Sequence, residues 1–250
     1  MSAALPEEIH TVTQTNSSVI VASRNRHQQL EELINSVINL DPLPYELVIV
    51  DDASDKPIEE SVQFKESDLR IRIFRNDPNQ GPAKARNTGV HRSRGSILLF
   101  TDDDCIVHPQ WAGILVKRLV TGSPDLGGIG GKVIARDTDI FSRYFEFHQI
   151  LNPKPHDKMN PKRVPYLVTA NCAIQKDTFM RAGGFDCNIP IAGGEDVALS
   201  LKILKQQLFL EKEENAIVWH RFKPRLRNFY HTFFRYGLGG RYVVDRYLPL

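Results

Sequence analysis

Short apolar segments alternate with segments of helical periodicity through the first half of the chain. Apolar residues recur at helical spacing in 27–40 and 83–93. The segments around these two are rich in β-branched residues and bounded by polar turns, as strands are: 18–22, 46–50, 70–74 and 97–100. Strands and helices alternating at this pitch form parallel βαβ units with right-handed crossovers. The sequence therefore predicts an α/β domain with a mostly parallel sheet flanked by helices.

The second half of the chain is less regular. A helix is expected over 195–206, and strands are expected over 127–133, 167–174 and 208–219. The segment 138–165 contains four prolines and is predicted to be a mobile or acceptor-facing excursion. No repeat or linker divides the chain. We expect a polar extension (1–17), one catalytic domain (18–220) and a C-terminal segment (221–250).

Composition excludes several classes of protein. The chain has 250 residues, of which 41% are hydrophobic and 25% charged, with a net charge of +2; a disordered or supercharged protein would differ. No apolar run approaches the about 18 residues of a membrane span, and Met1–Asn16 is too polar for a signal peptide. Three cysteines, Cys105, Cys172 and Cys187, match neither a disulfide framework nor a CxxC metal motif. We therefore expect a cytoplasmic protein without zinc or an iron–sulfur cluster.

Aspartates follow two of the predicted strands. Asp51 and Asp52 follow 46–50, and Asp102-Asp103-Asp104 follow 97–100. Ligands of open α/β sheets bind at the carboxyl ends of strands, and clustered carboxylates repel one another unless a cation offsets them. Oxygen ligands select a hard ion such as Mg²⁺ or Mn²⁺. The first pair could equally be a turn or a helix cap, whereas a metal better explains the second group.

Common phosphate-binding glycine motifs are absent. No GxGxxG sequence follows a predicted strand, and Gly127–Lys132 lacks both the spacing and the hydroxyl of a P-loop. A nicotinamide dehydrogenase and a P-loop ATPase are therefore disfavoured.

Seven short segments occur in an order that is typical of one enzyme family. They are Val19–Ala22, Val48–Ser54, Asn79–Gly89, Leu98–Cys105, Asn171–Ala173, Gly183–Asp186 and Gly194–Ser200. Over about Ser18–His220 the chain resembles the family 2 glycosyltransferases, which have the GT-A fold. The resemblance implies a Rossmann-like mixed sheet, a nucleoside-diphosphate-sugar donor, Mg²⁺ or Mn²⁺, and transfer with inversion. By analogy, it suggests cell-envelope or exopolysaccharide assembly.

The resemblance also implies roles for single residues. Asp102 and Asp104 match the DxD motif that holds the metal, and His220 matches a histidine that reaches back to it. Asp196 matches the catalytic base, next to Glu195. Asp51 or Asp52 would contact the nucleotide base, and Arg86 would lie beside the base and ribose. The residues expected at the donor are Ala22, Arg24, Asp51, Asp52, Lys84, Arg86, Asn87, Asp102 and Asp103.

Some of these residues have plainer explanations. Acids at a helix N-terminus are favoured by capping and by the helix dipole, which alone could account for Glu195 and Asp196. His220 could be an ordinary satisfied histidine, and Gly183-Gly184 is expected to be a helix C-cap. Thr101 and Cys105, which flank the DxD motif, depart from the commonest family pattern without removing a carboxylate.

These observations favour a metal-dependent inverting glycosyltransferase. One alternative is a non-catalytic GT-A-like binding module, although the acid set is intact. Another is a sugar-phosphate nucleotidyltransferase. That enzyme expects a glycine-rich GxGTR-like loop after the first strand, where this chain has Ala22-Ser-Arg-Asn-Arg26.

The C-terminal segment is basic and aromatic. From His220 to Leu250, seven basic residues face one acid, Asp245. Aromatic residues at 229, 230, 233 and 234 predict one face of a helix, interrupted near Gly237–Gly240. This face could pack on the catalytic domain, or 221–247 could contact an anionic membrane surface where a glycan or lipid-linked acceptor is presented. No motif for nucleic acid accompanies the basic residues.

Overall fold

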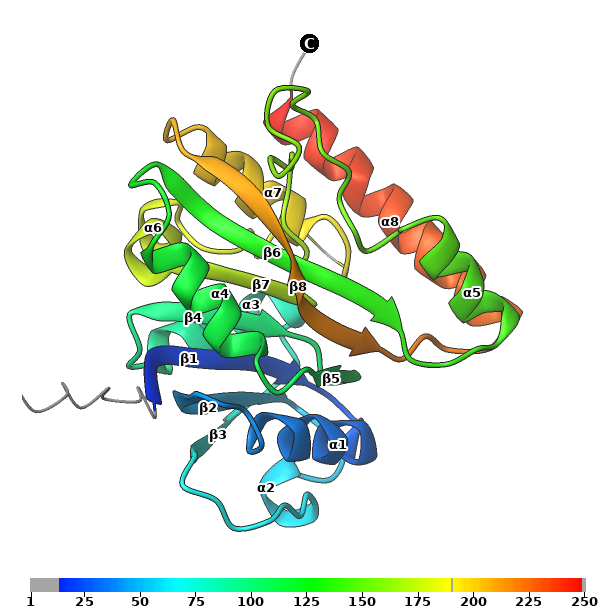
Figure 1. Ribbon diagram of the computed structural model, residues 1–250. Coiled ribbons are helices and arrows are strands. Elements are labelled where there is room, and N and C mark those ends of the chain that lie inside the picture. The colour runs from blue at the N-terminus through cyan, green and yellow to red at the C-terminus, as the bar shows by residue number, and fades with distance from the viewer. Residues whose placement is uncertain (1–13, 190, 249–250) are drawn as a thin grey trace, which may run out of the picture.

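The protein folds around one mixed β-sheet covered by helices, shown in Figure 1 as a computed structural model that describes residues 14–189 and 191–248. The strand order is β3-β2-β1-β4-β7-β6-β8-β5. The strands are β1 (Gln14–Ser23), β2 (Leu43–Asp52), β3 (Arg70–Asn76), β4 (Ile97–Thr101), β5 (Cys105–Val107), β6 (Leu126–Ala135), β7 (Asn171–Gln175) and β8 (Phe209–His220). The helices are α1 (His27–Val37), α2 (Ile58–Ser61), α3 (Pro82–Arg92), α4 (Trp111–Val120), α5 (Ile140–Phe147), α6 (Lys176–Arg181), α7 (Glu195–Leu204) and α8 (Leu226–Tyr247).

The first half of the chain confirms the predicted parallel βαβ units. Strand β1 pairs in parallel with β2 and β4, and β2 with β3. Alternate strand residues enter two separate cores: Val19 and Val21 pack with α1 and α4 on one face, and Ile20 with α3 and α7 on the other. Strand β1 begins at Gln14 rather than at Ser18. Residues 1–13 of the predicted extension lie outside the described residues.

The second half of the sheet reverses direction. Strand β7 is antiparallel to β4 and β6, and β5 is antiparallel to β8. Neither β5 nor α4 was predicted, and β7 starts later than the expected 167. Asn171 fixes this region: its amide donates to the carbonyls of Lys132 and Ala216 and accepts from Trp111 Nε1 at 2.8 Å. Asn171 therefore joins β6, β8 and α4, which accounts for this family motif structurally.

The segment predicted as a mobile excursion begins with a helix. The side chain of Asp139 caps α5 by accepting from the backbone N–H groups of Phe141 and Ser142. Apolar side chains of α5 then pack against α8, and the rings of Phe145 and Phe233 stack at 5.6 Å. The start of this segment is therefore anchored to the C-terminal helix, and the prediction was wrong there. The short helix was missed because its fixing contacts are distant in sequence.

Helix α8 runs without a break, so the predicted interruption at Gly237–Gly240 was wrong. Gly239 is buried in close contact with the loop that precedes α7: a Cβ on Gly239 would lie 1.7 Å from the carbonyl oxygen of Gly193. The glycine thus serves close packing of helix and loop. The far end of α8 is held by Asp186, whose Oδ2 accepts from the hydroxyls of Tyr242 (3.2 Å) and Tyr247 (2.7 Å).

The predicted aromatic face of α8 is split in two. Phe229 and Phe233 pack against α5, whereas Tyr230 and Phe234 are exposed and stack on each other at 6.2 Å. Within residues 14–189 and 191–248, no helix combines the length and apolar character needed to cross a membrane.

The glycines of α8 give a test of this packing. We expect Gly239→Ala to lower the free energy of unfolding by about 1–3 kcal/mol, because the new methyl group overlaps the Gly193 backbone. Gly237→Ala and Gly240→Ala are matched controls, since a Cβ there meets nothing within 4 Å. They should raise stability by up to about 1 kcal/mol through helix propensity. Urea unfolding measures all three, and equal effects would contradict the packing described.

Candidate active site

The strand ends and one helix N-terminus bring the predicted acids together. Asp102, Asp103 and Asp104 follow β4, and Glu195 and Asp196 open α7. His220 ends β8 and is paired in register with Cys105 of β5. This antiparallel pairing carries His220 to Asp104, although the two residues are far apart in sequence.

Arg86 joins the two groups of acids. The buried guanidinium of this α3 residue donates to Asp102 Oδ1 at 2.7 Å and to Glu195 Oε1 at 3.0 Å. Glu195 Oε2 in turn accepts from the backbone N–H of Gly193 at 2.7 Å. Burial lowers the pKa of Arg86, but the charges of Asp102 and Glu195 outweigh burial and raise it above its usual value. Arg86 is thus a permanent cation between the end of β4 and the start of α7, and its expected place beside the base and ribose stays a prediction.

A second arginine holds the other aspartates. Arg26 donates to Asp103 Oδ1 at 2.7 Å and to Asp104 Oδ2 at 2.6 Å, and Ser23 donates to Asp103 Oδ2 at 2.7 Å. Burial raises the pKa of the Asp103 carboxyl to about 6 against the opposing charge of Arg26. The Asp103 carboxylate therefore points into the protein. To contact the nucleotide-sugar donor, it would have to break its hydrogen bonds with Arg26 and Ser23.

Asp104 and His220 form the part of the site suited to a metal ion. Asp104 Oδ1 is buried without a hydrogen-bond donor and lies 3.3 Å from His220 Nε2. The sulfur of Cys105 is within 4.8 Å of both ligand atoms, but burial raises the pKa of this thiol and keeps it protonated. Burial also raises the pKa of Asp102, but Arg86 outweighs burial and the net pKa is lowered, so Asp102 is charged. Free carboxylate oxygens and an imidazole fit a divalent cation.

The aspartates at the end of β2 are buried and shape two loops. Asp51 accepts from the backbone N–H groups of Ser54 and Ile58 and pairs with Arg75. Asp52 accepts from the side chains of Asn76 and Asn79 and from the N–H groups of Gln80 and Gly81, which lead into α3. Both of the explanations considered for this pair, loop capping and nucleotide contact, are compatible with this position. The capping is observed, and contact with a nucleotide base stays a prediction.

The other residues that were predicted to contact the sugar donor differ in whether they are exposed or already hydrogen-bonded. Ala22 lies near the end of β1, and Arg24 and Lys84 are exposed, so they are open to a ligand. Asn87 is already engaged, because its Oδ1 accepts from the N–H of Phe185 and its Nδ2 donates to the same residue's carbonyl, both at 3.0 Å. Contact of Asn87 with the donor stays a prediction. Gly183 lies beyond α6 with φ 73°, as expected for a helix C-cap.

Asp196 has the protonation behaviour of a base that works near neutral pH. Its Oδ1 accepts from the N–H of Val197 at 2.8 Å. Burial, followed by the charge of Glu195, raises the pKa of the Asp196 carboxyl to about 7. The two acids of α7 therefore differ, because Glu195 is paired with Arg86 and Asp196 is not paired with a cation in the described part of the chain.

Three residues at the site were missed by the sequence analysis. Arg26 could have been found, because it follows the first strand. Lys223 lies near Arg26, whose charge, together with partial burial, lowers the pKa of the lysine. Tyr236 packs on the loop before α7, where a Cβ on Gly193 would lie 3.2 Å from its Cδ1. Burial, followed by the charge of Asp196, raises the pKa of Tyr236. No sequence signal links α8 to this site.

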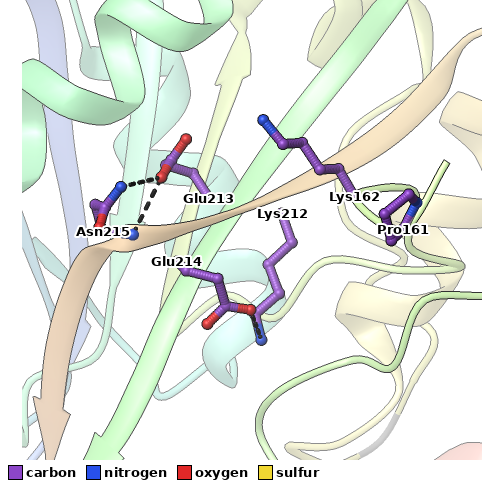
Figure 2. Close-up of a pocket in the computed structure, with 6 residues that line it drawn as sticks. All are labelled: Pro161, Lys162, Lys212, Glu213, Glu214 and Asn215. Carbon is purple, nitrogen blue, oxygen red and sulfur yellow. Dashed lines mark hydrogen bonds and ion pairs between the residues drawn. The ribbon is translucent and has the colours of Figure 1, made fainter.

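Figure 2 shows a surface pocket that contains none of the predicted site residues. It forms where β8 bulges, since Lys212 pairs with Gly130 but Ile217 already pairs with Lys132. Its walls are Pro161, Lys162, Lys212, Glu213, Glu214 and Asn215. The pair between Lys212 and Glu214 (2.8 Å) neutralises part of the pocket.

Comparison with known proteins agrees with the geometry. The sequence model of Glycosyl transferase family 2 matches residues 18–182. An uncharacterized glycosyltransferase of Haemophilus influenzae is 27% identical over 201 residues, covering 77% of this chain and 63% of its own. A glucosyl-dolichyl phosphate glucuronosyltransferase of Haloferax volcanii is 28% identical over 190 residues, covering 72% and 59%. The chain thus spans less than two thirds of either relative.

A solved structure has the same fold. It is mannosyltransferase PcManGT from Pyrobaculum calidifontis in complex with GDP-Man and Mn²⁺, which superposes with a TM-score of 0.68 at 19% identity. The match covers 92% of this chain and 64% of the mannosyltransferase. The predicted GT-A fold is thereby confirmed. Since the family match also extends over most of the chain, this protein belongs to glycosyltransferase family 2.

Proposed function

We propose that this protein transfers a sugar from a nucleoside-diphosphate-sugar donor to an acceptor hydroxyl, with inversion at the anomeric carbon and with a divalent metal. The observation that carries the proposal is the buried Oδ1 of Asp104, which accepts no hydrogen bond and lies 3.3 Å from His220 Nε2, two residues beyond a charged Asp102. A buried carboxylate oxygen without a donor is costly unless a cation or a ligand completes it. The intact site favours an enzyme over a non-catalytic module.

Asp102, Asp104 and His220 would hold the metal. When bound, Mg²⁺ or Mn²⁺ supplies positive charge that stabilises the diphosphate leaving group. The mannosyltransferase of similar fold was solved with a nucleotide sugar and Mn²⁺, which supports this cofactor and this class of donor. Asp51 or Asp52 would lie at the nucleotide base, with exposed Arg24 and Lys84 near the donor.

Asp196 would act as the base. It removes the proton of the acceptor hydroxyl while that oxygen attacks the anomeric carbon, and the bond from this carbon to the diphosphate oxygen breaks with its electron pair going to the diphosphate. A single displacement of this kind inverts the anomeric centre. Arg86 has a positioning role, because it fixes Asp102 on the donor side relative to Glu195, the neighbour of Asp196. Base catalysis contributes about 10²–10⁴-fold.

The acceptor would be a glycan or a lipid-linked sugar at the cytoplasmic side of a membrane, in cell-envelope or exopolysaccharide assembly. The archaeal relative supports this only through its name, which refers to a glucosyl-dolichyl phosphate. Release of nucleoside diphosphate from a panel of donors with Mn²⁺ tests the proposal. Donor binding without turnover on any acceptor would favour the non-catalytic module.

The metal site is tested by Asp104→Asn. This change removes the charge of the unpaired oxygen, and we expect transfer to fall to background while the thermal unfolding temperature stays within a few degrees. EDTA should have the same effect on the unchanged protein, reversed by Mg²⁺ or Mn²⁺. Full activity in the chelator would reject the metal.

The base is tested by Asp196→Asn, which keeps the volume of the side chain but cannot accept a proton. We expect kcat to fall about 10²-fold or more with donor affinity little changed. Asp177→Asn is the matched control, since Asp177 also lies in the first turn of a helix, α6, but is exposed. Loss of donor affinity with normal turnover would instead assign Asp196 to the donor site.

The same residue sets the expected pH dependence. Because burial raises the pKa of Asp196 to about 7, the base is increasingly protonated, and therefore inactive, below that pH. We expect kcat/KM to fall by about tenfold per pH unit below 7. The residual activity of Asp196→Asn should lack this limb. A profile that is flat from pH 5 to 8 would contradict the assignment.

A further inference from the structure

Helix α8 lies on the outer edge of the molecule (Figure 1), and it exposes apolar side chains along one line. Leu226, Tyr230, Phe234 and Leu238 are each four residues apart and between 47% and 71% exposed. Residues at this spacing share one helix face, and a water-facing side of a helix is normally polar. The opposite side of α8 is the one that packs on the domain, through Gly239 and Val243.

Helix α5 lies beside α8 and also exposes apolar side chains. Ile140 and Phe147 are 76% and 83% exposed, and Tyr144 is 40% exposed. The Tyr144 ring also contacts the ring of Phe229 at 5.1 Å, so the two helices meet there. We call the resulting area the α5–α8 surface. It consists of Ile140, Tyr144, Phe147, Leu226, Tyr230, Phe234 and Leu238.

Among the described residues, three unpaired arginines lie around the α5–α8 surface, against one exposed acid on α5, Glu146. Arg143 on α5, and Arg225 and Arg227 at the start of α8, are exposed and make no ion pair in the described part of the chain. Arg241, in contrast, is neutralised by Asp245 at 2.6 Å. Large apolar and aromatic side chains bordered by arginines are typical of helices that lie in the interface of an anionic membrane. A protein partner would not require the positive border.

We propose that the α5–α8 surface docks on an anionic lipid bilayer, with both helices lying in the plane of the interface. The exposed side chains enter the headgroup region, and the arginines contact lipid phosphates. No described helix is suited to crossing the bilayer, so this contact is peripheral. This docking proposal does not depend on the reaction that we propose for the protein.

Docking has a consequence for the acceptor, which does rest on the proposed function. The inner side of α8 touches Gly193 and Gly194, immediately before Glu195 and Asp196. A helix is about 10 Å wide, so a docked α8 holds the opening of α7 close to the bilayer. A hydroxyl carried by a membrane lipid could then reach Asp196 without leaving the membrane.

Vesicle sedimentation tests the surface with two groups of variants. The apolar variant combines Leu226→Ser, Tyr230→Ser and Phe234→Ser, and the charge variant combines Arg225→Glu and Arg227→Glu. The matched controls are Phe64→Ser with Val120→Ser, and Lys65→Glu with Lys158→Glu, all at exposed positions outside the surface. Circular dichroism and thermal melting verify that each variant is folded.

We expect the unchanged protein to sediment with vesicles containing one third phosphatidylglycerol, and to bind phosphatidylcholine vesicles much less. Binding should weaken between 0.05 and 0.5 M salt, as screening predicts, by about tenfold or more. Each basic residue lost should cost about fivefold in binding. The charge variant should therefore lose at least about 25-fold, and the apolar variant a comparable amount, while both controls bind normally.

Absence of binding to anionic vesicles would overturn the proposal, as would equal binding by the variants and the controls. Concentration-dependent dimerisation abolished by the apolar variant, without vesicle binding, would show that a second copy covers the surface instead. Release of nucleoside diphosphate in solution is measured in parallel. Vesicle binding without any turnover would reject the proposed function and leave the surface intact.

Discussion

The buried pairing of Arg86 with Asp102 and Glu195 is the interaction on which the site depends. It joins a residue of α3 to the end of β4 and to the start of α7, which come from different parts of the chain. Removing one member of a buried ion pair costs about 3–5 kcal/mol, because the remaining charges are left without a partner. Folding and the arrangement of the acids therefore both depend on Arg86. A substitution of Arg86 would first destabilise the folded protein and only through that affect catalysis.

Charge balance explains why so many acids can share one end of the sheet. Arg86 pairs with Asp102 and Glu195. Arg26 pairs with Asp103 and with one oxygen of Asp104. Among the fully buried carboxylate oxygens of the described residues, Oδ1 of Asp104 accepts no hydrogen bond and has His220 Nε2 at 3.3 Å. This oxygen lies where a cation is expected. Asp196 lies outside both arginine pairs, which lets burial raise its pKa.

The sequence was most informative where the structure is locally determined. The parallel strands β1 to β4 could be predicted from runs such as Leu47–Val50, which are apolar on both faces. The ends of β2 and β4 could be predicted from the aspartates there. The sequence was least informative where contacts are distant: α5 is fixed by α8, and Gly239 is explained only by the loop at Gly193. The intramolecular partners of Arg86 and Asn87 could not be predicted, since partners depend on which helices meet, and the donor contacts expected for both residues stay predictions. The roles of Asp196 and His220 were predicted from the family resemblance, not from the periodicity of the apolar residues.

The bulge in β8 has a consequence for how this sheet can change in evolution. Side chains alternate across a strand, so a shift of one residue turns every following side chain to the other face. Between Ile217 and His220 the pairing with β5 and β6 is regular, and a deletion there would point His220 away from Asp104. Residues 213–215, before the buried Ala216, lie in the bulge of the ladder and can absorb insertions or losses without passing the shift along the strand. The part of the pocket wall in Figure 2 that belongs to the bulge, Glu213, Glu214 and Asn215, can therefore vary in length among related chains, while the three residues before the histidine keep their spacing.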